Sequence, residues 1–157
     1  MFVIGDKVVY PMHGAGVVES IEERQILGET RSYYIVRIAH GNMQVMVPVA
    51  GVDAAGLRYI VRSSDLDAVY KELSSESTPM DDNWNRRNRD NMEKLKTGNL
   101  CKVAEVIRNL ARIDRVKKLS TGEKKLLNNA RQILSSEMMM VLGVGEEEAL
   151  SMIDKAI

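Results

Sequence analysis

Cysteine and histidine are scarce in this chain of 157 residues, and their scarcity argues against several classes of function. The single cysteine, Cys101, makes no disulfide within the chain, and with His13 and His40 it offers no metal-ligand spacing. Both histidines lie in glycine turns, so no nucleophile can be paired with a histidine base. We therefore expect a protein without metal, cofactor or enzymatic activity.

Long apolar segments are also absent. No run of eighteen apolar residues is present to span a bilayer, and Asp6 and Lys7 follow the amino terminus too closely for a signal peptide. The apolar share of 45% is still enough to build a core without disulfides or metals. We expect a cytoplasmic protein.

The net charge of zero conceals a strong segregation of charge along the chain. Residues 1–72 carry 7 basic and 9 acidic side chains, whereas residues 84–131 carry 14 basic and 5 acidic ones. The last 26 residues are acidic again, with 1 lysine and 5 acidic side chains. A basic block of this kind is typical of a polyanion-binding surface, although a solvated helix surface has a similar composition.

The first half of the chain has the pattern of short strands separated by glycine turns. In residues 6–60, β-branched side chains alternate with polar ones, and Tyr34 and Val36 share one face at a period of two. Gly28 is placed to take a positive φ between the two arms of a hairpin. The pattern predicts a small antiparallel β-barrel-like domain of the Tudor or SH3 type, followed by a short helix at residues 64–73.

The second half changes to a helical period. Residues 74–80 are polar and contain Pro79, so we expect the linker there. From residue 81 onwards the apolar side chains recur every three or four residues, and the stretch from Ser120 to Glu123 matches a capping box. The predicted fold class is therefore α+β in two domains, with a β-rich domain at residues 1–73 and a helical bundle at residues 81–157.

Trp84 is the only tryptophan, and it lies among polar and charged residues. At about 100° per residue, Leu95 is its closest apolar neighbour on the same helix face, which favours a role in the core. Over the next two turns, however, the positions on that face are Arg87, Asn88 and Asn91. An indole beside arginines and asparagines also suits insertion into the minor groove or stacking on a splayed base. The residues alone leave both interpretations open.

Further cations flank this stretch. Arg108, Arg112 and Arg115 are expected on one helix face opposite the apolar stripe. Lys124 and Lys125 fall in the first turn of a helix, where cations oppose the helix dipole. A bound phosphate would relieve that repulsion, while an ordinary solvated helix face remains the alternative for each of these cations.

Three motifs, taken together, are familiar. They are GDKVVYPMHGAGVVESIEER at residues 5–24, NWNRRNRDNMEKL at 83–95, and KVAEVIRNLARID with LSTGEKKLLNNARQIL between 102 and 134. Over essentially its whole length the chain resembles the CarD/CdnL family of bacterial transcription regulators. The resemblance implies an RNA-polymerase-interacting Tudor-like domain, as in the transcription-repair coupling factor, followed by a helical domain that contacts promoter DNA.

The resemblance also implies where the protein binds the polymerase. In the family an edge of the small sheet docks on the polymerase β subunit, and here Arg24 matches a basic residue of that surface. The docking strand corresponds to residues 43–48, which gives Gln44, Val45, Met46, Val47 and Pro48 as polymerase-binding residues. Met46 stands where other members have arginine, so a thioether replaces a possible ion pair.

On the DNA side, the resemblance implies that Trp84 wedges into the minor groove at the upstream edge of the transcription bubble, so that the open complex lives longer. Arg86, Arg89 and Lys124 match basic residues beside the wedge, and the adjacent Arg87 and Lys125 complete our predicted DNA-binding set. Asn129 occupies a further position that is basic in some members. We expect a monomer that binds DNA weakly without polymerase and reaches the nucleoid through it.

Two alternatives are considered beside this hypothesis. The first is a pure protein adaptor of RNA polymerase in which Trp84 belongs to the core. The second is an RNA-binding small barrel that uses Tyr33, Tyr34 and Tyr59 for stacking.

Overall fold

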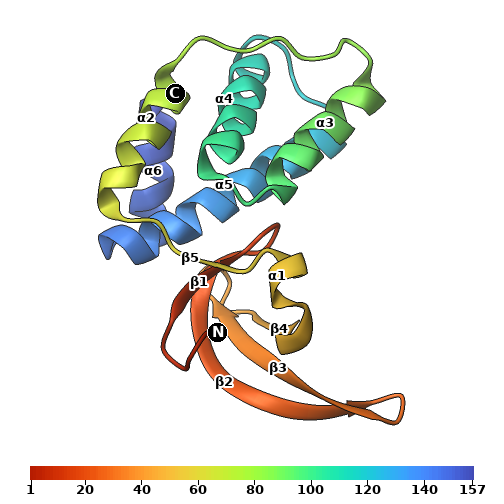
Figure 1. Ribbon diagram of the computed structural model, residues 1–157. Helices are drawn as coiled ribbons and strands as arrows, with labels where there is room; N and C mark the ends of the chain where they lie inside the picture. The colour runs from red at the N-terminus through yellow and green to blue at the C-terminus, as the bar shows by residue number, and fades with distance from the viewer.

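The computed structural model describes residues 1–157 and contains an antiparallel sheet followed by a bundle of helices (Figure 1). The strands pair in the order β4-β3-β2-β1-β5. β4 and β5 form the two free edges, so the sheet does not close into a barrel. The predicted α+β class is confirmed. The strands are β1 (Lys7–Tyr10), β2 (Gly14–Ile26), β3 (Glu29–Ile38), β4 (Gln44–Pro48) and β5 (Arg58–Tyr59).

A long hairpin of β2 and β3 extends away from the helices (Figure 1). Its two-residue loop consists of Leu27 and Gly28, with φ of 52° and 81°. Two successive positive φ angles give a loop whose twist matches that of the flanking strands. Gly28 therefore takes the conformation expected from the sequence, and Leu27 takes the same one at a steric cost.

One face of the sheet carries a small apolar core. Val8, Val18, Tyr34, Val36 and Val47 are almost completely buried there. Phe2 packs edge-on against Tyr34, with ring centroids 5.7 Å apart. After β4, a turn of 3-10 helix, η1 (Val49–Gly51), and α1 (Val52–Ala55) lead into β5.

The remaining helices form a larger core around α4 and α5. The helices begin at good N-cap residues: Asn83 caps α3, Asn99 caps α4 and Ser120 caps α5 through side-chain oxygens. Gly143 ends α5 in the left-handed conformation. The elements are η2 (Ser63–Asp65), α2 (Leu66–Ser74), α3 (Trp84–Lys96), α4 (Leu100–Val116), α5 (Thr121–Leu142) and α6 (Glu146–Ala156).

Helix α2 packs with the helices, although we expected it to close the β-rich half. Its buried side chains, Leu66, Val69 and Leu73, belong to the same cluster as those of α4 and α5. The segment expected as a linker is held against α4, because Arg112 donates to the Ser75 carbonyl at 2.7 Å. Arg108 reaches the Glu72 carbonyl at 2.7 Å. The packing boundary therefore lies between β5 and α2.

Helix α5 crosses the sheet and joins the two parts of the molecule (Figure 1). The Ala15 amide donates to Ser136 Oγ at 2.9 Å. Arg58 of β5 forms a two-pronged ion pair with Glu137, with both N–O distances 2.9 Å. Arg58 also donates to the Gly98 carbonyl at 2.8 Å. No helix of the structure is long and apolar enough to cross a membrane.

Candidate nucleic-acid interface

Trp84 is the first residue of α3, at the end of this helix that lies away from the sheet (Figure 1). Asn83 fixes the start, because its Oδ1 accepts from the Arg86 amide at 3.1 Å. Asp81 in turn accepts from the Asn83 amide at 2.7 Å. The thirteen residues of α3, Trp84–Lys96, span about 20 Å, and the turn that follows brings the Gly98 carbonyl to Arg58.

The indole of Trp84 lies on the start of α5. Its Nε1–H donates to Ser120 Oγ at 3.0 Å, and a Cβ placed on Gly122 would come within 3.3 Å of the ring atom Cζ2. The residue nevertheless keeps 45% of its surface exposed. The indole is thus attached along one edge and open to solvent elsewhere, so it is not a core side chain.

A buried ion pair holds α3 and α5 together one turn further on. Arg87 donates to Glu123 through two hydrogen bonds of 2.8 and 2.7 Å. The Glu123 side chain is only 3% exposed, and its hydrogen bonds are the main cause that raises the pKa of Arg87 above its ordinary value. Sequence reasoning placed Arg87 on the DNA-binding surface, whereas the structure commits its guanidinium to Glu123.

Three arginines with neither an acidic partner nor a carbonyl contact lie on α3 or at the end of α4. Nine of the twelve arginines form an ion pair or bond to backbone carbonyls; the other three are Arg86, Arg89 and Arg115, close to Trp84 in sequence or on the helix that leads to Ser120. Lys124 and Lys125 follow in the first turn of α5 without an ion pair. Unpaired cations repel each other, so they suit a surface that receives phosphates.

Two expected surface cations are instead internal. Arg108 is fully buried and contacts Glu72 and Thr78, and Arg112 binds the segment between α2 and α3. The prediction of one solvated face for Arg108, Arg112 and Arg115 is therefore wrong for the first two. Only Arg115 is exposed.

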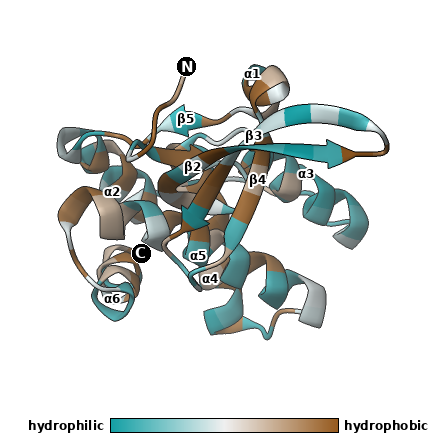
Figure 2. Ribbon diagram, turned by 90° about the horizontal axis from the view of Figure 1, so that it is seen from below, coloured by the Kyte–Doolittle hydropathy of each residue, from teal (hydrophilic) through white to brown (hydrophobic).

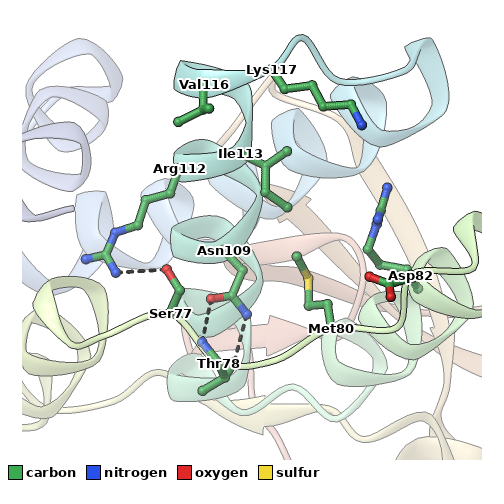
Figure 3. Close-up of a pocket in the computed structure, with 10 residues that line it drawn as sticks. Ser77, Thr78, Met80, Asp82, Asn109, Arg112, Ile113, Val116 and Lys117 are labelled. Carbon is green, nitrogen blue, oxygen red and sulfur yellow. Dashed lines mark hydrogen bonds between the residues drawn. The ribbon is translucent and has the colours of Figure 1, made fainter.

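A groove of about 460 Å³ lies where residues 77–82 cross α4 (Figure 3). Its polar groups bind one another: Asn109 donates to Thr78 Oγ1 at 2.8 Å and Arg112 donates to Ser77 Oγ at 3.0 Å. These bonds fix the crossing segment against α4. The groove is therefore the gap that remains where residues 77–82 pack against α4, and we do not assign it a ligand.

A second exposed surface lies on the sheet, far along the chain from Trp84. Residues paired across antiparallel strands share a face, so the pairs Arg24↔Arg31, Tyr33↔Pro48 and Ile35↔Met46 place Arg24, Met46 and Pro48 on one face. Gln44 lies on the same face and donates to Glu19 at 2.7 Å. β4 is an edge strand, so its outer backbone groups have no strand partner.

Within the expected docking strand the side chains divide between the two faces. Val47 is fully buried in the sheet core, so its side chain is not available to a partner, whereas Val45 is half-buried. The exposed apolar side chains of this part of the sheet are Met43 and Met46 at β4, Ile21 on β2, and Ile26 and Leu27 at the hairpin tip, which stands out as hydrophobic in Figure 2. Leu27 is completely exposed.

Sequence reasoning missed the residues that support these surfaces. Ser120, Gly122 and Glu123 were seen only as a capping box, although Glu123 turns to Arg87 instead of back to its own cap. Arg58 and Glu137 gave no local signal, because they are 79 residues apart.

Comparison with known proteins identifies the class. Residues 2–61 match the CarD-like/TRCF RID domain, and residues 68–154 match the CarD C-terminal domain. The chain is 37% identical over 151 residues to YdeB of Bacillus subtilis (strain 168), a protein named as a candidate transcription factor. The alignment covers 96% of this chain and 99% of YdeB. These matches define a transcription regulator with an RNA-polymerase-interacting type of amino-terminal domain. The chain belongs to the CarD family.

Proposed function

We propose that the protein binds the RNA polymerase β subunit through its sheet and inserts Trp84 at the upstream edge of the promoter bubble, which stabilises the open complex without catalysis. The single observation that carries this proposal is the half-exposed indole at the start of α3, a helix whose exposed Arg86 and Arg89 have no acidic partner. A core tryptophan would be covered, and exposed arginines that follow an exposed tryptophan on the same helix suit contact with nucleic acid.

The physical effect follows from where the indole would be inserted. At the bubble edge the terminal base step is already unstacked, so an aromatic wedge meets little resistance from the duplex. The exposed Arg86, Arg89 and Lys125 and the half-buried Lys124 would bind phosphates on either side. An inserted ring opposes re-pairing, so the open complex should close more slowly.

The polymerase contact is supported by the second surface. Arg24 and Met46 share the exposed face, and β4 leaves one edge available for an added strand. Docking through the sheet would hold the weakly binding helical domain close to promoter DNA at high effective concentration. In this proposal Arg87 positions α3 and does not contact DNA.

The test is the lifetime of open complexes formed by the cognate polymerase on a ribosomal-RNA-type promoter after challenge with competitor. We expect the wild type to prolong the lifetime several-fold and Trp84→Ala to lose most of that gain while remaining folded. Ile4→Ala, which removes an exposed apolar side chain from the amino-terminal segment and not from the helices, is the control and should behave as wild type.

The same experiment separates the adaptor alternative. A well-folded Trp84→Ala protein that binds polymerase and prolongs the lifetime as fully as wild type would reject the wedge and favour an adaptor. The RNA-binding alternative is weakened by burial, because Tyr33 and Tyr34 are at most 9% exposed and offer no stacking face. Tyr59 is exposed but packs against Phe2, with ring centroids 5.0 Å apart.

A further inference from the structure

We propose that Ser120 and Gly122, which we call the indole seat, are positioning residues that fix the orientation of Trp84 before DNA is bound. This inference rests on the proposed function and adds how the wedge is aimed and what it can recognise. If the inference holds, the wedge needs more than the presence of the ring. It also needs the contacts by which Ser120 and Gly122 orient the ring at the start of α5.

The first contact is polar. Ser120 Oγ accepts from the indole Nε1–H at 3.0 Å and from the Glu123 amide at 3.3 Å. A hydroxyl oxygen has two lone pairs, so both bonds are possible at once. The residue that starts α5 therefore also sets the rotation of the ring, and helix capping and indole orientation share one oxygen.

The second contact is steric. Gly122 does not have a positive φ, so its backbone would accept alanine, and alanine favours a helix more than glycine does. A Cβ at this position would lie 3.3 Å from Cζ2 and 4.0 Å from Cη2 of Trp84. The backbone conformation gives no reason for glycine here, whereas the ring resting on this turn does.

The Arg87–Glu123 pair holds the indole seat and the Trp84 ring at a fixed distance from each other. Its two hydrogen bonds join the first turn of α3 to the first turn of α5, and Glu123 is nearly inaccessible. Trp84 lies three residues before Arg87, and Gly122 directly precedes Glu123. The ends of the two helices therefore cannot separate without breaking a buried ion pair.

The seat has a consequence for recognition. Because the indole N–H is already bound to Ser120, the docked ring has no hydrogen-bond donor left for a base edge. Only its apolar rim is available for insertion. We therefore infer that the wedge responds to an unstacked, widened base step and tolerates different base pairs there.

The experiment fills the seat in steps with Gly122→Ala and Gly122→Leu. The matched control is Gly145→Leu, at the N-cap of α6, where a new Cβ would meet nothing within 4 Å. Ser120→Gly removes the acceptor while retaining a residue that caps helices nearly as well as serine. Each variant is measured for folding, for the NMR shift and exchange rate of the single indole proton, and for open-complex lifetime with polymerase.

We expect the indole resonance to move and its proton to exchange faster in Ser120→Gly, and the lifetime gain to fall stepwise from Gly122→Ala to Gly122→Leu. Gly145→Leu should keep both wild-type values. A folded Gly122→Leu with an unchanged indole resonance and a wild-type lifetime would overturn the inference. If Trp84→Ala also leaves the lifetime unchanged, the proposed function fails, while the indole resonance still decides whether the seat exists.

Discussion

At the scale of single residues, Glu105 shows how the segment between α2 and α3 is kept in place. Thr78 donates to its carboxylate at 2.7 Å and Lys94 lies 3.3 Å away. Burial acts to raise the pKa of Glu105, but the bond from Thr78 and the charges of Lys94 and Lys102 outweigh it, so the pKa lies below its ordinary value of 4.5. The ionised carboxylate thus stabilises the fold.

The sign of the pH effect follows from this lowered pKa. Glu105 adds stability above about pH 4.5, and that stability is lost as the pH falls through the lower folded-state pKa. We expect Glu105→Gln to reduce the free energy of unfolding by about 1 kcal/mol at pH 7, and the difference from wild type to shrink on acidification. Urea titrations between pH 7 and pH 3 measure it; a difference independent of pH would contradict the assignment.

At the scale of elements, the loop of the β2–β3 hairpin combines strain with exposure. Leu27 adopts a φ of 52° with its side chain fully in solvent. Asparagine adopts this positive φ at a lower steric cost than leucine does. No contact within the chain compensates this strain. An apolar side chain held in this way suits a partner surface, and the tip belongs to the sheet that we propose docks on polymerase.

Leu27→Asn should therefore change two properties in opposite directions. Relief of strain is expected to raise the free energy of unfolding by about 0.5–1 kcal/mol. Loss of the apolar contact should weaken binding to polymerase, measured by titration of labelled protein. Leu27→Ala is the control, because it removes the contact and keeps the strain. Unchanged binding in both variants would show that the tip lies outside the interface.

The elements also show what local sequence can and cannot predict. The cap at Ser120 was recognisable because its capping oxygen bonds only three residues away. The stripe of α2 predicted burial but not against which neighbour. Arg108 seemed solvated because Glu72 and Thr78, which bury it, lie 30 or more residues away in sequence. The indole seat could not be predicted, because it exists only where α3 and α5 meet, and no local sequence pattern encodes that contact.

At the scale of the whole molecule, the two proposed surfaces are joined through a rigid path. α3 runs from Trp84 to Lys96, and two residues further on the Gly98 carbonyl accepts from Arg58 of β5. Pro11 follows β1 and lies between the turns at Gly56 and Gly98. A sheet docked on polymerase would therefore fix the direction of the wedge.

The Arg58–Glu137 pair is the center of this path, and its removal should affect both stability and function. Glu137 is fully buried and also accepts from the Val61 amide at 2.8 Å, so Arg58→Met leaves an unpaired buried carboxylate. We expect a loss of about 3 kcal/mol in the free energy of unfolding, partly recovered in Arg58→Met with Glu137→Met.

The double variant then isolates the role of orientation, because it recovers part of the stability without the directional ion pair. If the path aims the wedge, the double variant should bind polymerase as wild type does and yet prolong the open complex less. The control is Arg131→Met with Asp154→Asn, which removes an exposed pair between α5 and α6. A double variant with the full wild-type lifetime would mean that packing alone orients the helices, since the ion pair would then contribute stability and no direction.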